Sequence, residues 1–315
     1  MRFFTLLLSC LSVGLFSSSC STASNANSGW QGPITVGTIE EPLINESSGL
    51  APSRRADDVY WINNDSQGEP VLYAIDGKGR YLGSVRLEGA TNYDWEDCSS
   101  FKVDGKSYLV AADVGDNKAQ RKDCVLYIIA EPDPAELNPS REISATLTGQ
   151  IRFTYPGGAR DCESIAVDPV EGNIYLISKR TTPPVVYRLP LSAEAGSTTA
   201  VAEIVGNLNG IPPPTGPTAL IETTWGKFRA WPCSLDISSD QRTAVVLSYG
   251  EVYIYNRLSG QSWAEAFASE PIQLVAHALP QAEGVCFTND NQTVLVATEG
   301  VPVPLLGYSL KAKPE

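Results

Sequence analysis

The chain has 315 residues, of which 43% are hydrophobic and 19% charged, so it can bury a large core and is neither disordered nor fibrous. It carries 36 acidic and 23 basic side chains, and the formal net charge of −13 disfavours the phosphate backbone of nucleic acids as a partner. A negative net charge instead favours cations as binding partners, or anions that bind together with a metal ion.

The N-terminus has the pattern of an export signal. Arg2 precedes an apolar stretch, residues 3–16, which is too short to span a membrane as a helix. The small residues before Cys20 and the polar tail after it resemble a bacterial lipoprotein signal, in which the cysteine is acylated. Ser17 stands where such signals usually carry Leu, so ordinary secretion with cleavage near Ala23 is the alternative.

We therefore expect an exported protein, anchored in the cell envelope through a lipid on Cys20 or else secreted or periplasmic. The expected organisation is a signal peptide at 1–19, a flexible linker at 20–32 and a single domain at 33–312. The five cysteines beyond the signal have no C-x-x-C spacing, which excludes zinc fingers. We expect small buried thiols, with Cys162–Cys233 as the candidate for one disulfide.

A repeated strand pattern organises the rest of the chain. Five segments share an apolar strand, a turn rich in Asp, Asn, Gly or Ser, and a second apolar strand; they start near Gly49, Glu96, Glu163, Cys233 and Glu283. A third strand with a tyrosine follows each pair, and a fourth follows in the first four units, at 81–87, 150–155, 201–208 and 271–276. Short strands, regular turns and no amphipathic helix predict an all-β fold, a β-propeller.

We expect five blades and a monomer. The fifth unit lacks a fourth strand, and Ile34–Ile39 is a spare β segment that can complete this last blade. Six blades are the alternative, because the stretch 192–231 is long. It contains a proline-rich run, 211–217, which cannot be a central strand because proline donates no ladder hydrogen bond, so we expect an inserted loop.

Acidic residues recur where the chain enters the innermost strands. Alignment gives one ring of Ser48, Glu96, Glu163, Cys233 and Glu283, and a second ring, two residues earlier, of Glu46, Asp94, Asp161, Trp231 and Gln281. An offset of two in a strand puts both rings on the same, tunnel-facing side. The loops between second and third strands open on that face and add Asp65, Asp113, Asp116, Asn117, Lys179, Arg180, Tyr249 and Glu299.

Carboxylates held this close raise one another's pKa unless a cation or bound protons compensate. Oxygen ligands without histidine favour calcium, with magnesium or manganese next. The expected metal ligands are Glu96, Glu163, Glu283, Glu46, Asp113 and Glu299. The alternative is that these acids only cap strand ends and turns; the repeated Asp-x-Glu at Asp94 and Asp161 favours the metal.

Lys179 and Arg180 form the adjacent basic pair on this acidic face. Together they can bind a small anionic or phosphorylated ligand, with Asp65, Asp116 and Asn117 beside it. A structural ion pair with a neighbouring blade is the equally open alternative. The single histidine, His277, lies outside the site, and no G-x-S-x-G occurs, so a nucleophilic triad is poorly supported.

Several motifs resemble a family of exported bacterial β-propeller proteins without an established activity: Tyr93–Cys98, Ala112–Asn117, Asp161–Ile165, Ile177–Arg180 and Glu283–Val285. More distantly, Glu46–Leu50 and the repeated acids look like the calcium-dependent nucleotidases (apyrases), and the phytase-like propellers are a comparable relation. This resemblance implies a calcium site and hydrolysis of phosphate esters. Trp231 and Cys233 replace acids in the fourth unit.

Two functions follow from these observations. In the first, the ion ties the inner strands together and the face binds a ligand or a cell-surface protein. In the alternative, the chain is a calcium-dependent phosphoester or phosphoanhydride hydrolase, in which Asp94 or Asp161 orients the attacking water while Lys179 and Arg180 steady the phosphate.

Overall fold

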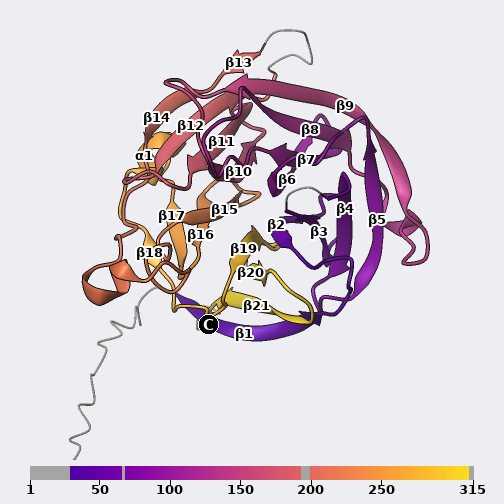
Figure 1. Cartoon of the computed structure of the whole chain (residues 1–315). Coiled ribbons are helices and arrows are strands. Elements are labelled where there is room, and N and C mark those ends of the chain that lie inside the picture. The colour runs from indigo at the N-terminus through magenta and orange to yellow at the C-terminus, as the bar shows by residue number, and fades with distance from the viewer. Residues whose placement is uncertain (1–28, 66–67, 193–198, 312–315) are drawn as a thin grey trace, which may run out of the picture.

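The computed structural model describes residues 29–65, 68–192 and 199–311, and it is an all-β, β-propeller-like fold. Small sheets stand around a central axis, with their first strands innermost (Figure 1). The expected signal peptide, Cys20 and most of the linker lie outside the described residues. Within the described part of the chain, no helix is long and apolar enough to cross a membrane.

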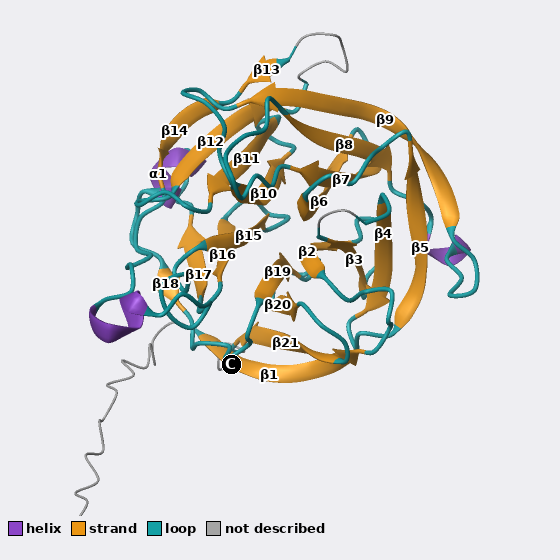
Figure 2. Ribbon diagram, in the orientation of Figure 1, coloured by secondary structure: helices purple, strands orange, loops and turns teal. Residues whose placement is uncertain are grey.

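The strands follow one another outward from the axis in units of four. The first two units are β2 (Ser47–Pro52), β3 (Val59–Asn64), β4 (Val71–Asp76) and β5 (Tyr81–Glu88), then β6 (Trp95–Val103), β7 (Lys106–Asp113), β8 (Cys124–Ala130) and β9 (Ile143–Thr154). The long outer strand β9 also pairs in parallel with β5, which joins these two units into one continuous sheet (Figure 2).

The later units repeat the pattern. They are β10 (Cys162–Asp168), β11 (Asn173–Ser178), β12 (Val185–Pro190) and β14 (Glu203–Asn207); β15 (Pro232–Ile237), β16 (Thr243–Ser248), β17 (Val252–Asn256) and β18 (Ile272–Gln273); and β19 (Ala282–Phe287), β20 (Thr293–Thr298), β21 (Val303–Leu310) and β1 (Trp30–Ile39). The short β13 (Ala200–Val201) pairs with β9. Helices are η1 (Pro134–Glu136), η2 (Gly216–Leu220) and α1 (Trp263–Phe267).

The two ends of the described chain share one sheet. β1 pairs antiparallel with β21, from Trp30 opposite Leu310 to Ile39 opposite Val303. The pairing expected for Ile34–Ile39 is therefore confirmed. It joins the first strand to the last unit, so the ring cannot open at this point without breaking a sheet (Figure 1).

The inner strands close the ring. β2 contacts β6, β6 contacts β10, β10 contacts β15, β15 contacts β19, and β19 contacts β2. Every residue of β2, β15 and β19 is buried. The hydrophobic core fills the space between neighbouring sheets, as where Phe101, Val110 and Leu126 of one unit meet Ile165, Leu176 and Tyr187 of the next.

The stretch between β14 and β15 is an inserted loop, as expected from its prolines. Its regular structure is limited to η2, and it exposes Leu220 and Trp225. Thr224 ties the loop to the last unit, because its hydroxyl donates to the carbonyl of Pro280 at 2.5 Å.

The proposed disulfide between Cys162 and Cys233 is wrong, because the cysteines that the structure describes are all free and buried. Cys162 packs between β10 and the second unit, whereas Cys233 packs toward β19, where its thiol donates to the carbonyl of Ala282 at 3.0 Å. The two side chains therefore belong to different hydrophobic clusters. Their other expected role, as small buried hydrophobes, is confirmed.

We expect His277 to make the fold sensitive to acid. Its Nδ1 accepts from the amide of Leu279 at 3.1 Å, and burial lowers its pKa from 6.5 to about 4. Since the folded pKa lies below the unfolded one, the stabilisation is present above pH 6.5 and is lost as the pH falls toward 4, by roughly 3 kcal/mol.

Urea unfolding of the protein and of His277→Asn between pH 4 and pH 7 measures this effect. The free-energy difference between the two proteins should shrink as the pH falls. A constant difference across this range would contradict the assignment.

Candidate functional site

Each inner strand carries a β-bulge at the same place. The register shifts between Ser47 and Gly49 in β2, and equivalent shifts follow in β6, β10, β15 and β19. The bulged residues are Ser48, Glu96, Glu163, Cys233 and Glu283. A bulge re-aims its side chain away from the alternation of the strand. The first predicted ring is thus a ring of bulged residues at one end of the tunnel.

Five carboxylates from this end meet in two overlapping groups. The carboxylate oxygens of Asp65, Asp94 and Glu96 lie within 4.8 Å of one another, and so do those of Glu96, Asp161 and Glu163. Glu96 belongs to both groups. We call these five residues the carboxylate cluster; it unites members of both predicted rings with one loop residue.

Gly115 makes room for the cluster. A Cβ atom at this position would lie 2.1 Å from Oε1 of Glu96 and 2.7 Å from Oδ2 of Asp94. Any side chain here would push these carboxylates out of place, so the glycine of the Asp-Val-Gly-Asp-Asn loop is required by close approach.

Burial and mutual repulsion act on the cluster together. Burial, followed by the charge of Asp65, raises the pKa of Asp94 to about 6. Burial and the neighbouring charges of Glu163 and Asp65 raise the pKa of Glu96 well above its ordinary value. The pKa of Glu163 is raised in the same way, because burial and the charge of Glu283 outweigh Lys179. A bound cation would reverse this repulsion.

Lys179 lies inside the site. Its Nζ pairs with Oε1 of Glu163 and donates to the hydroxyl of Tyr249 at 2.8 Å. The Tyr249 hydroxyl donates in turn to Oε1 of Glu283 at 2.7 Å. Burial alone would lower the pKa of Lys179, but Glu163, Glu96 and Glu283 raise it on balance. The lysine is thus a fixed internal counter-ion shared by three sheets.

Glu283 and Glu299 form a second, adjoining acidic pair. Burial, opposed in part by Lys179, raises the pKa of Glu283 to about 8, and the charge of Glu299 contributes to the rise. Burial also raises the pKa of Glu299, which is half-buried. Glu46, the remaining expected ligand on this side, is exposed, and its amide donates to Oδ1 of Asn64 at 3.4 Å.

Arg180 holds Asp161 and Asn117. Its Nε pairs with Oδ2 of Asp161, and its Nη2 donates to Oδ1 of Asn117. The guanidinium carbon lies 4.5 Å from the centroid of the Trp231 ring, in a cation–π contact. The other Asp161 oxygen accepts from the amide of Asp116 at 2.9 Å. Trp231, which replaces an acid in the fourth unit, therefore positions the arginine.

Two predicted site residues have local partners instead: Asp113, an expected metal ligand, and Asp116, an expected ligand-binding residue. Asp113 pairs with Arg121 at 2.7 Å and accepts from the amides of Tyr93 and Asp94. Asp116 accepts from the amides of Gln120 and Arg121 at 2.9 and 2.8 Å. Both brace the loop that carries Gly115, and neither belongs to the carboxylate cluster.

One atom of the cluster has no partner. Oε2 of Glu163 is buried and accepts no hydrogen bond among the described residues. A buried carboxylate oxygen without a donor is unfavourable by about 1–3 kcal/mol, and more when charged. Two groups of hard oxygen atoms and an orphaned acceptor fit the requirements of a divalent cation.

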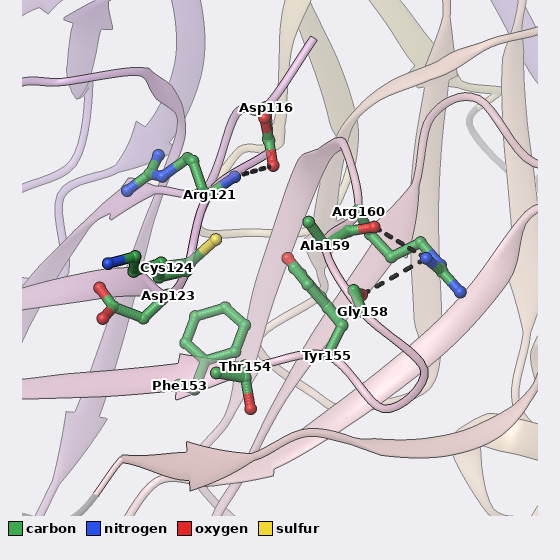
Figure 3. Close-up of a pocket in the computed structure, with 11 residues that line it drawn as sticks. Asp116, Arg121, Asp123, Cys124, Phe153, Thr154, Tyr155, Gly158, Ala159 and Arg160 are labelled. Carbon is green, nitrogen blue, oxygen red and sulfur yellow. Dashed lines mark hydrogen bonds between the residues drawn. The ribbon is translucent and has the colours of Figure 1, made fainter. Parts of the chain in front are cut away.

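A pocket of about 230 Å³ lies beside the site, between the loop after Asp116 and the end of β9. Figure 3 shows Arg121 and Arg160 on opposite sides of it, and Arg160 donates to the carbonyls of Gly158 and Ala159 in its own loop. Arg121 and Arg160 therefore do not converge on a common point.

The sequence pattern assigns no specific role to two residues of the site, Tyr249 and Arg121. Tyr249 lies in a predicted loop of this face, but its link between Lys179 and Glu283 depends on contacts between different units. Arg121 likewise acts through a contact that depends on the fold. For Gly115, the sequence predicts a turn that aims its neighbours inward, and the structure adds the close approach to Glu96 and Asp94.

Comparison with known proteins leaves the family open. No protein-family model matches the chain, and no curated protein matches it. Among solved structures, the crystal structure of Chaetomium thermophilum Raptor aligns with 85% of this chain at 13% sequence identity, with a TM-score of 0.39. The aligned region spans 20% of the Raptor chain.

Proposed function

We propose that this chain is an exported, lipid-anchored propeller of five blades that binds a divalent cation, calcium, at one mouth of its tunnel and uses that face to bind a ligand or a cell-surface protein. Five units of four strands, with β1 completing the last, support the blade count. The observation that carries the metal proposal is the convergence of carboxylate oxygens on Glu96 from two directions within 4.8 Å.

The acidic groups suit calcium better than magnesium or a softer metal. Calcium takes six to eight oxygen ligands and tolerates irregular geometry, whereas magnesium demands a near-ideal octahedron. Asp65, Asp94, Glu96, Asp161 and Glu163 would hold the ion, and magnesium or manganese are the alternatives. When bound, the ion would supply positive charge at the place where burial and repulsion now act on these carboxylates.

Binding is favoured over hydrolysis by the contacts of the basic pair. Arg180 pairs with Asp161 and donates to Oδ1 of Asn117, so its guanidinium is already engaged. Lys179 is buried against Glu163 rather than free to meet a phosphate. These contacts support the structural ion pair considered for the basic pair over an anion-binding role for Lys179.

Thermal unfolding of the chelator-treated full chain tests the metal site. Calcium at about 100 times its dissociation constant should stabilise the fold by about 2.7 kcal/mol and raise the melting temperature by about 5 °C or more. Magnesium and manganese should give smaller shifts. Glu96→Gln should abolish the calcium shift, because Glu96 belongs to both groups.

Glu131→Gln is the matched control. Glu131 is also buried, but it lies at the other end of the strands and accepts from Nε1 of Trp61 at 3.0 Å. This variant should melt earlier yet keep the full calcium shift. No shift with any ion, or a full shift in Glu96→Gln, would refute the metal proposal.

A further inference from the structure

The inserted loop between β14 and β15 carries apolar side chains that the fold leaves uncovered. Leu220 is 83% exposed, Ile221 52% and Trp225 46%, and these three large side chains stand within six residues of one another. Single exposed apolar residues are ordinary on a protein surface, whereas a group of them marks a contact with a membrane or a partner. We call Leu220, Ile221 and Trp225 the apolar tip.

Packing explains the inner side of this loop but not the apolar tip. Phe228 stacks on Trp231 with ring centroids 4.3 Å apart, and both pack against the hydrophobic cluster of the last two units. The apolar tip belongs to none of the hydrophobic clusters of the described residues. The short helix η2, which contains Leu220, stands outside the outline of the ring (Figure 2). The core therefore gives no reason for the apolar residues of the tip.

Backbone hydrogen bonds fix the shape of the loop. The amide of Ile221 donates to the carbonyl of Thr218 at 3.1 Å, and the amide of Lys227 donates to the carbonyl of Ile221 at 2.7 Å. Gly226 is required by this turn, because a Cβ atom there would lie 2.2 Å from the carbonyl oxygen of Ile221. Peptide groups that are already paired make entry into an apolar medium less unfavourable. The tip can therefore leave water without unfolding.

The loop is nearly uncharged although the chain has a formal net charge of −13. Between Asn209 and Gly226 the one ionisable side chain is Glu222, and it pairs with Lys227 at 2.9 Å. A basic protein partner would be attracted to the acidic surfaces of the chain rather than to this neutral tip. Tryptophan beside leucine and isoleucine is instead typical of segments that lie in the interface between a membrane and water.

The described chain begins on the same side of the ring. Trp30, at the start of β1, packs against the same cluster as Phe228, and the start of β1 and the inserted loop lie in one sector of the ring (Figure 1). Cys20, the expected lipidation site, precedes Gly29 by nine residues, which span at most about 30 Å when fully extended. A lipid on Cys20 would therefore hold this side of the ring close to a bilayer.

We propose that the apolar tip inserts into the interface of the bilayer to which Cys20 anchors the protein, as a second, non-covalent contact. A lipid on a linker limits the distance between the ring and the bilayer but does not set the orientation of the ring. The tip supplies the second point of contact that sets it. This inference rests on the lipid anchor of the proposed function and is independent of the metal site.

An environment-sensitive fluorophore on Leu220→Cys tests the proposal. The native thiols that the structure describes are all buried, so the label should react with the new cysteine. The full chain, produced with its own N-terminal signal, is mixed with vesicles of phosphatidylcholine. The emission of the label should shift to the blue. Lipids brominated in their acyl chains should quench it, because an interfacial apolar face lies about 5–10 Å into the boundary between headgroups and acyl chains.

Val170→Cys is the matched control. Val170 is 79% exposed, but it lies in the turn between β10 and β11, in another unit of the ring. Its label should keep the emission of a fluorophore in water. An equal blue shift at both positions, or no shift at position 220, would overturn the proposal. A shift at position 220 that needs no lipid and grows with protein concentration would also overturn it, and would indicate a second copy of the chain as the occupant.

Two further measurements separate this inference from the lipid anchor. Mass spectrometry shows whether Cys20 carries a lipid, and flotation shows whether the protein stays with the vesicles. A lipidated protein that floats while the label at position 220 stays in water would refute the role of the apolar tip alone. With Cys20 unmodified the lipid anchor fails. A blue shift at position 220 would then still support insertion of the tip, and its absence would overturn it.

Discussion

Replacing Lys179 with methionine is expected to lower the free energy of unfolding by about 3–5 kcal/mol at pH 8 in the absence of calcium, the range for removing one partner of a buried ion pair. Lys179 is 5% exposed, and its ammonium group forms a direct ion pair with Glu163. The negative charges of Glu96 and Glu283 also attract it. Methionine fills a similar volume without the charge. The decrease in the free energy of unfolding therefore measures the effect of leaving the carboxylates unpaired. Urea unfolding followed by tryptophan fluorescence measures it.

The pH dependence has a definite sign. Burial raises the pKa of Glu283 from 4.5 to about 8, so the folded state binds this proton more tightly than the unfolded chain does. Stability contributed by this group is therefore present below pH 4.5 and lost as the pH rises toward 8. Without Lys179 the carboxylates bind protons still more tightly. The difference in the free energy of unfolding between the unmodified protein and Lys179→Met should therefore shrink as the pH falls.

Controls separate charge from packing. Lys179→Arg keeps the charge and should lose much less stability than the methionine variant. Calcium should recover part of the loss in Lys179→Met, because the ion replaces the missing positive charge. A loss below about 1 kcal/mol at pH 8 would mean that the ion pair is well solvated, and Lys179 would then not be the internal counter-ion of the cluster.

The inner strands can be predicted from the sequence because each unit repeats the same pairs of apolar segments. β11, for example, is Asn173–Ser178, and its residues from Ile174 on are all buried, as its apolar side chains predict. The outer strands were harder to place. β9 runs from Ile143, seven residues before the predicted start at Gln150, because it pairs with β5 as well as β8. Pairing of one strand with a second sheet depends on residues far away in the sequence, so the local sequence pattern does not predict it.

The position of the carboxylates in β6 depends on a feature that strand alternation does not include. An offset of two residues predicts Asp94 and Glu96 on one face, but a bulge interrupts β6 between Trp95 and Asp97. The two carboxylates still meet, because the bulge re-aims Glu96 and Gly115 leaves space beside it. A bulge depends on the register with the neighbouring strand, which a single sequence does not reveal.

The basic pair shows a different limit. Lys179 and Arg180 are adjacent letters, yet one is buried against Glu163 and Tyr249 while the other stacks on Trp231 and stays partly exposed. Their partners come from other units of the ring. Charge patterning located the pair on the acidic face, but only the tertiary contacts distinguish an internal counter-ion from a surface residue.

Asp97→Ala is expected to destabilise the ring itself, by about 3 kcal/mol or more. Asp97 is fully buried beside the bulge, and its Oδ2 accepts from the amides of Ile165 at 2.9 Å and Leu235 at 3.3 Å. Its Oδ1 accepts from its neighbour's amide at 2.9 Å and from the hydroxyl of Ser234 at 3.2 Å. One carboxylate thus ties β6 to β10 and β15, inner strands that belong to separate units.

Removal of this acceptor leaves buried donors unsatisfied, each unfavourable by about 1–3 kcal/mol. Burial raises the pKa of Asp97 well above its ordinary value, although the backbone donors act in the opposite direction. Asp97→Asn keeps one acceptor oxygen of the same shape and should lose clearly less stability than Asp97→Ala. Urea unfolding of both variants gives the comparison.

Hydrogen exchange locates the effect. In Asp97→Ala the amides of Ile165 and Leu235 should exchange faster relative to those of Val245 and Val246 on β16, which keep their ladder partners. Equal stability of the alanine and asparagine variants, with unchanged exchange at Ile165 and Leu235, would show that the inner strands are held by packing alone. The predicted result instead makes a buried carboxylate on an inner strand the link between sheets that share no hydrogen-bonded ladder.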